Sequence, residues 1–74
     1  MKRDELAPID RLIVRVIKKS KAPMSTYRIS KKAKLSWSTI NTHCYKLMSI
    51  GVLDSRIEET PFGQKKILWK VKSR

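Results

Sequence analysis

The chain has 74 residues and a formal net charge of +12, because 18 lysines and arginines stand against six aspartates and glutamates. This length predicts a single domain, residues 1–74. The sequence contains no run of about 18 apolar residues, so a membrane-spanning helix is not predicted. The single cysteine, Cys44, rules out an internal disulfide, and Cys44 with the lone His43 does not make a zinc site. We therefore expect no metal and no cofactor. The sequence also lacks paired acids, a nucleophile–base pair and a phosphate loop, so an enzyme is not expected.

The basic residues are unevenly distributed along the chain. No acid stands between Asp10 and Asp54, whereas this stretch contains Arg11, Arg15, Lys18, Lys19, Lys21, Arg28, Lys31, Lys32, Lys34 and Lys46. A patch of one sign predicts a polyanionic partner, because charge that served only solubility would be of mixed sign. Residues 1–7 are predicted to form a disordered arm, in which Lys2 and Arg3 contact DNA without sequence preference. The N-terminus has no apolar signal-peptide core, so we expect a cytoplasmic (intracellular) protein.

Residues 8 to about 20 have the spacing of an amphipathic helix. Pro8 suits its first turn. Apolar residues follow at positions i, i+3, i+4, i+7 and i+8, namely Ile9, Leu12, Ile13, Val16 and Ile17. Val14 is then predicted to lie on the outer side of the helix, as a contact point for another protein. A second copy of the chain would pack there too, with Arg11 and Lys18 nearby.

A second, short helix is predicted after a break at residues 21–23. Ser25 is a good N-cap for a helix that runs from Thr26 to about Ala33. Only Lys34 and Leu35 separate this helix from the next one. If Lys34 adopts a left-handed conformation in that tight turn, the cost is about 1–2 kcal/mol, which its charge beside a phosphate would offset.

The third helix is predicted over residues 36–50, from an N-cap serine to a glycine that suits a left-handed C-cap position. Its buried face is marked by residues at helical spacing, Ile40, Cys44 and Leu47. Its outer face has no carboxylate and consists largely of Ser38, Asn41, Thr42, Tyr45 and Ser49. Serine, threonine and asparagine form helices less readily than glutamate or lysine, because their side chains compete for backbone hydrogen bonds. This face therefore requires an explanation other than helix formation.

The hydrophobic period changes from about 3.6 residues to 2 after the third helix. Two alternating runs predict strands, Leu53, Ser55 and Ile57, followed by Ile67, Trp69 and Val71. The turn-forming residues 58–64 join them into a hairpin. A lone hairpin is marginal in water, so the side with Trp69 is predicted to pack on the helices. Leu68 is left on the outer face, as a second apolar contact point. The predicted fold class is α+β, with three helices followed by a two-stranded hairpin.

The closely spaced helices and the hairpin together carry a family resemblance. It rests on the short turn, on caps at Ser25 and Ser36, on Gly51 before Val52-Leu53, and on the inward residues Ile29, Ala33, Leu35, Ile40 and Leu47. The stretch from 23 to 71 resembles small winged helix-turn-helix regulators, such as the antibiotic-resistance and arsenical-resistance repressors and the short winged-helix proteins of archaea and their viruses. The resemblance implies that the third helix enters the DNA major groove and that the hairpin is the wing. Those repressors dimerise through further helices, whereas this sequence stops just after the wing, so we expect a monomer or a weak homodimer through the first helix.

The resemblance gives the outer face of the third helix a function. Base edges in the major groove offer donors, acceptors and thymine methyls, which asparagine, serine and threonine contact, whereas carboxylates would repel the phosphates. The predicted recognition-helix contacts are Trp37, Ser38, Thr39, Asn41, Thr42, Tyr45 and Lys46. The predicted backbone contacts are Thr26, Tyr27, Arg28, Lys31 and Lys34, and the predicted wing contacts are Gln64, Lys65 and Lys66. Glu58 and Glu59 do not fit this role and are predicted to lie on the far side of the wing.

We therefore expect a sequence-specific double-stranded DNA-binding protein that regulates transcription. One alternative is an RNA-binding winged helix, against which the chain lacks aromatic pairs that would stack unpaired bases on a sheet. A second is a protein-interaction module of a larger complex, with Val14 and Leu68 as contact points. A membrane-surface role is disfavoured, since the apolar face of the first helix has a core to cover. For Trp37 and Tyr27, packing and contact with the DNA backbone both remain open.

Overall fold

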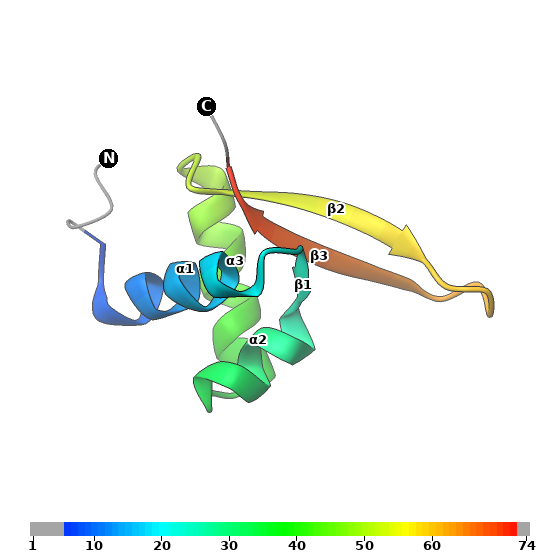
Figure 1. The fold of residues 1–74 in the computed structure, drawn as a ribbon, viewed down its shortest axis with the longest axis horizontal. Helices are drawn as coiled ribbons and strands as arrows, with labels where there is room; N and C mark the ends of the chain where they lie inside the picture. The colour runs from blue at the N-terminus through cyan, green and yellow to red at the C-terminus, as the bar shows by residue number, and fades with distance from the viewer. Residues whose placement is uncertain (1–5, 73–74) are drawn as a thin grey trace.

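Three helices and three strands make up the fold, and the computed structural model describes residues 6–72 of the chain. In chain order the elements are α1 (Pro8–Ser20), β1 (Met24–Ser25), α2 (Thr26–Ala33), α3 (Trp37–Ser49), β2 (Leu53–Glu59) and β3 (Lys65–Val71). Figure 1 shows the helices gathered together, with β2 and β3 extending from them as a long hairpin. The predicted α+β winged helix-turn-helix is therefore confirmed.

The sheet has one strand more than the sequence predicted. Met24 and Ser25 pair antiparallel with Trp69 and Leu68, so that the strand order is β1-β3-β2. Two residues are too few to show the alternation that marks a strand in a sequence, and the prediction of a two-stranded hairpin missed β1. Because α2 begins directly after β1, this pairing anchors the start of the helix-turn-helix to the wing.

Serine side chains cap α2 and α3 as predicted. Ser25 Oγ accepts a hydrogen bond from the Arg28 N–H, and Ser36 Oγ accepts one from the Thr39 N–H, each at 3.2 Å. In the turn between the two helices, Lys34 has a φ of 58° and is left-handed. The short turn therefore takes the strained conformation that the sequence suggested, with a lysine at a position that glycine would occupy at lower cost.

A small core lies between the helices and the sheet. Its fully buried apolar members are Ile13, Ile29, Ile40, Cys44, Leu47, Leu53 and Trp69. Burial raises the pKa of the Cys44 thiol to about 12, in keeping with its predicted place in the core. Leu6 is also buried, so it belongs to the core and not to an arm. The rest of the predicted arm with its two basic residues, at positions 1–5, lies outside the described residues.

Two apolar residues that were predicted to be exposed are buried. Val14 is buried because α1 packs against three elements, α2, α3 and β3. The buried face of α1 is therefore wider than the apolar spacing in the sequence predicted. Leu68 is buried because β3 is the central strand, with Ser25 on one side and Arg56 on the other. The prediction that Val14 and Leu68 serve as outer contact points is therefore wrong.

Candidate nucleic-acid interface

The outer face of α3 is open to solvent because the opposite face is held by the core. Of the predicted contacts on this helix, Trp37, Ser38, Thr42, Tyr45 and Lys46 are exposed, and Thr39 and Asn41 are half-buried. The Thr39 hydroxyl also accepts a hydrogen bond from the Ser36 hydroxyl at 2.8 Å, which ties it to the cap. The first turns of α3 thus present a row of neutral hydrogen-bonding groups on a fixed backbone.

Asn41 is oriented by a chain of hydrogen bonds that starts in the core. The Trp69 Nε1–H donates to Thr26 Oγ1 at 2.8 Å, and the Thr26 hydroxyl donates to Asn41 Oδ1 at 3.5 Å. Oδ1 faces Thr26, and within residues 6–72 Nδ2 donates to no other group, so both of its hydrogens can serve an acceptor outside this part of the chain. Thr26 is only 3% exposed, so its hydroxyl is not available for the predicted contact with the DNA backbone. The prediction that Thr26 contacts the DNA backbone is therefore wrong.

Tyr45 packs against the indole ring of Trp69. Its ring meets Trp69 edge-on, with the ring centroids 5.1 Å apart and an angle of 88° between the planes. The side chain is nevertheless 46% exposed. Packing therefore sets the position of the Tyr45 ring while leaving much of it at the surface beside Asn41.

A buried carboxylate neutralises the charged part of α3. Asp10 on α1 is 2% exposed, and its two oxygens lie 2.6 Å from Lys46 Nζ and 2.7 Å from His43 Nδ1. Burial raises the pKa of Asp10, but hydrogen bonds and charges from Lys46 and His43 outweigh it, so the pKa lies below its ordinary value. Lys46 was predicted to contact DNA, but its ammonium group is held by Asp10. Nothing in the local sequence connects these residues, because they lie on different helices.

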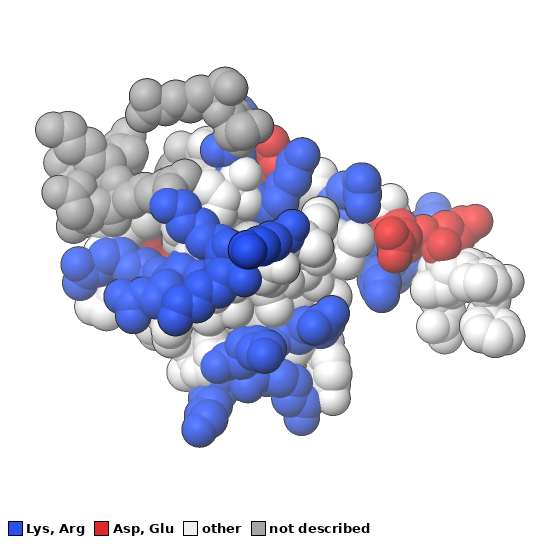
Figure 2. Space-filling view, viewed as in Figure 1, with Lys and Arg blue, Asp and Glu red and all other residues white. Residues whose placement is uncertain are grey.

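The basic surface comes mainly from the other two helices. The predicted contacts on α2 and its turn, Tyr27, Arg28, Lys31 and Lys34, are all exposed, and Lys31 Nζ lies 5.2 Å from the centre of the Tyr27 ring. Figure 2 shows lysine and arginine side chains spread over the helical part of the molecule, while the largest group of acids on this face lies on the hairpin. The positive charge is therefore strongest beside α3 and weaker on the wing.

The wing brings acids and lysines together instead of separating them. Glu58 lies opposite Lys66, and Glu59 lies opposite Lys65, in the register of β2 and β3. Residues directly opposite each other project from the same face of a sheet. The prediction that the two glutamates lie on the far side from the lysines is therefore wrong. The three predicted wing contacts, Gln64 included, are exposed.

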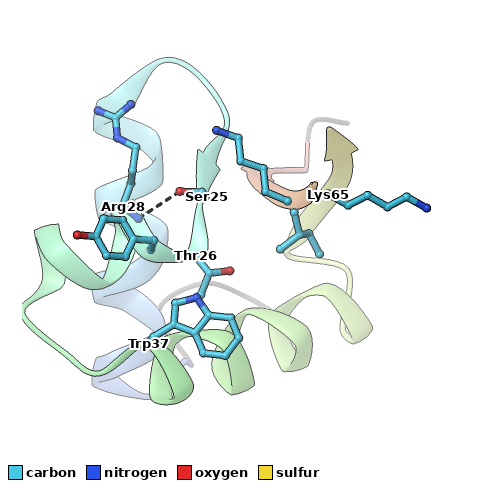
Figure 3. Close-up of a pocket in the computed structure, with 8 residues that line it drawn as sticks. Ser25, Thr26, Arg28, Trp37 and Lys65 are labelled. Atoms are coloured by element: carbon cyan, nitrogen blue, oxygen red, sulfur yellow. Dashed lines mark hydrogen bonds between the residues drawn. The ribbon is translucent and has the colours of Figure 1, made fainter. Parts of the chain in front are cut away.

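A groove of about 530 Å³ lies where α2, α3 and the wing meet, and it is lined by residues 25–28, Trp37 and residues 65–67. Figure 3 shows Arg28 and Trp37 on its helical side and Lys65 on the wing side. Tyr27 and Trp37 in this groove are 59% and 52% exposed. The sequence predicted several of these residues as separate DNA contacts but did not predict the groove. The groove depends on how β3 packs beside α2.

In the part of the chain that the structure describes, no helix is long and apolar enough to cross a membrane. Across residues 6–72, no group of three or more histidine, cysteine, aspartate or glutamate side chains is arranged to hold a metal ion.

Comparison with known proteins identifies the fold. No protein-family model and no curated protein matches the sequence. A possible transcriptional regulator from Methanosarcina mazei is similar in structure, with a TM-score of 0.83, 20% identity, and coverage of 97% of this chain and 61% of the regulator. The apo Zalpha domain of zebrafish PKZ has a TM-score of 0.73 and 23% identity, with 93% and 94% of the two chains covered. The PcaV transcriptional regulator of Streptomyces coelicolor, solved with its natural ligand, has a TM-score of 0.73 and 17% identity.

The alignment with PcaV covers 93% of this chain but 47% of PcaV. The chain thus spans about half to three fifths of the length of the two regulators and nearly all of the Zalpha domain. At these low sequence identities, the TM-scores establish a common architecture and nothing further. The chain has the fold of a small winged-helix domain.

Proposed function

We propose that this protein binds double-stranded DNA in a sequence-specific manner and regulates transcription, with α3 in the major groove and the wing on the backbone or in the minor groove. The observation that carries the proposal is the outer face of α3, which is exposed, acid-free and rich in neutral hydrogen-bonding groups. The likeness of the fold to two proteins named as transcriptional regulators supports it.

Asn41 is the central reader in this proposal. Its Nδ2 group is free to donate, and its Oδ1 keeps a second lone pair beside the one that Thr26 uses. An asparagine that donates to N7 and accepts from N6 of adenine makes a bidentate contact, which is worth about 1–3 kcal/mol of discrimination. Ser38 and Thr42 flank it on the exposed face, where hydroxyls can bond to either type of base edge. Trp37, Thr39 and Tyr45 shape the edge of this surface.

The remaining affinity comes from phosphates. Arg28, Lys31 and Lys34 are exposed beside α3, and Lys65 and Lys66 extend along the wing. If about five to seven phosphates are neutralised, a plot of log K against log salt concentration has a slope of about −4 to −6. Lys46 adds little to this slope in our proposal, because Asp10 already balances its charge.

One alternative loses its predicted contact points in the structure. The two contact points that the sequence predicted for a protein-interaction module, Val14 and Leu68, are both buried. We further propose a monomer or a weak homodimer through α1. The exposed residues of α1 include Arg11, Arg15 and Lys18, and like charges would oppose a tight dimer there. Light scattering on the DNA-free protein tests this, and a tight dimer at low concentration would contradict it.

The proposed function is tested by selection of bound fragments from random duplex DNA. We expect one enriched motif, and the selected site should then bind more tightly than a scrambled duplex of the same length at each of several salt concentrations. Equal affinity for the two duplexes would contradict sequence-specific binding. Tighter binding to single-stranded RNA than to the selected duplex would favour the RNA-binding alternative.

A further inference from the structure

The groove between α2, α3 and the wing is lined by two exposed aromatic side chains, Trp37 and Tyr27. We propose that it binds an unpaired DNA nucleotide, at a single-stranded end or bulge next to the duplex on α3. This inference rests on the proposed function, because it assumes that α3 holds duplex DNA. Its starting observation is that Trp37 and Tyr27 line one groove and are more than half exposed.

The exposure of Trp37 points to a stacking partner. Tryptophan is highly buried on average in folded proteins, and the other tryptophan here, Trp69, is fully buried in the core. Inside a duplex both faces of each base are covered by neighbouring bases, so an aromatic ring finds no open base face there, whereas an unpaired base offers one. Stacking of a base on an aromatic side chain is a recurrent contact with single strands, and it tolerates any sequence.

The charges around the groove fit the phosphate of such a nucleotide. Arg28 lines it from α2, Lys65 and Lys66 line it from the wing, and no carboxylate is among the lining residues. A space of about 530 Å³ is also within the range of about 300–1,000 Å³ that is typical of small-molecule sites.

The position of the groove links it to the duplex site. Trp37 is the first residue of α3, directly before the exposed Ser38 and one helical turn before Asn41. The groove therefore lies at the N-terminal end of α3, next to the residues that are proposed to contact the duplex. The aromatic pair comes from two helices and not from a sheet, so the lack of stacking aromatics on the predicted strands does not exclude it.

The test compares three forms of one DNA by fluorescence anisotropy at fixed salt. The first is a blunt duplex with the selected site, the second carries a short thymidine extension, and the third carries an abasic extension with the same number of phosphates. We expect the thymidine extension to bind about fivefold more tightly than the blunt duplex, or better, because one stacked base contributes about 1 kcal/mol or more. The abasic extension should lose most of that advantage.

Trp37→Leu should bring the ratio of thymidine-extended to blunt affinity close to one. The matched control is Phe62→Leu, because Phe62 is 90% exposed on the wing turn and does not line the groove. This variant should keep the ratio of the wild type. The emission of Trp37 should also be quenched by the extension in the wild type and in Phe62→Leu. Circular dichroism on each variant checks that it is folded.

Three results would overturn the inference, namely equal binding of blunt and extended DNA by the wild type, an abasic extension as effective as thymidine, or an unchanged ratio in Trp37→Leu. A failure of the proposed function looks different. In that case the selected blunt duplex binds no better than a scrambled one, and the effect of the extension is measured on the scrambled duplex with the same variants.

Discussion

The outer face of α3 and the wing would both meet DNA, but the fold holds them in different ways. On α3 the opposite face is anchored by fully buried residues, and two side chains of the outer face are fixed by contacts that lead to Trp69. In β2, by contrast, residues 55–59 are exposed, so the outer part of the hairpin has no core beneath it. The fold therefore fixes the positions of side chains on the outer face of α3, whereas the wing extends away from the core.

The charges follow the same division. The single basic residue of α3, Lys46, is balanced by Asp10, while the lysines of the wing face glutamates across the strands. The uncompensated charge lies on α1 and α2, and α2 with its turn directly precedes the predicted base-reading helix. This comparison suggests that base reading depends on rigid neutral groups, and that attraction to DNA comes from a neighbouring surface.

The largest effect is expected where α3 is tied to α1. Asp10→Ala removes the carboxylate that both Lys46 and His43 contact, so we expect it to lower the free energy of unfolding by about 2–4 kcal/mol. Urea unfolding followed by circular dichroism measures the loss. The matched control is Glu59→Ala on the wing, which should stay within about 0.5 kcal/mol of the wild type. Similar losses for both variants would show that the two regions do not differ in this way.

The next effect concerns specificity. Asn41→Ala should weaken binding to the selected site by about 1–3 kcal/mol and relax the choice at one base pair, with little change on a scrambled duplex. Titration of both duplexes at two salt concentrations measures this. Lys65→Ala, the control on the wing, should weaken both duplexes alike. If Asn41→Ala also did so, α3 would be a backbone clamp and not the reader.

The depressed pKa of Asp10 predicts a dependence of stability on pH. Since the pKa is lower in the folded than in the unfolded state, the unfolded chain binds the proton first on acidification. The contribution of Asp10 is fully present above the ordinary carboxyl pKa and is lost as the pH falls through the folded-state value. Below about pH 5, the free energy of unfolding should fall less steeply with decreasing pH in Asp10→Asn than in the wild type. The difference in slope should be at most about 1.4 kcal/mol per pH unit. Glu59→Gln serves as the control, and an equal flattening there would contradict the assignment.

The smallest effects are expected on the wing, and they should have opposite signs. Lys66→Ala should weaken binding to every duplex alike and make the salt slope shallower by about one unit. Glu58→Gln, directly across the strand, should strengthen binding to every duplex, because it removes a charge that repels phosphates. Anisotropy titrations over a range of salt concentrations resolve both. A change confined to one sequence would mean that the wing reads bases.

Local features of the fold could be predicted from the sequence. Ser25 and Ser36 cap their helices, Gly51 is left-handed after α3 with a φ of 81°, and Trp69 is in the core. Each of these depends on residues within one or two turns, or on a clear hydrophobic period. The left-handed conformation of Lys34 was considered from the sequence as a condition, because the tight turn of the similar families often has glycine at this position.

Features that join distant segments could not be predicted. The ion pairs of Asp10 depend on how α1 crosses α3, and the strand β1 exists only because β3 offers an edge to pair with. The facing of Glu58 and Lys66 depends on the register of the hairpin, which a five-residue turn can set in more than one way. The predicted DNA contacts themselves stay predictions, except that the Thr26 hydroxyl and the Lys46 ammonium already have partners inside the protein.

The pairing of β1 with β3 has a consequence for how the chain folds. During synthesis the helix-turn-helix is complete when Ser49 has been made, yet Met24 and Thr26 obtain their partners only with Trp69. Contacts between residues this far apart in the sequence require a long loop to close, which slows folding. When the three helices have been synthesised but β3 has not, the contacts that hold the start of α2, from β3 to Met24 and Thr26, are therefore still missing. The last strand to be synthesised is the one that completes the surface proposed to meet DNA.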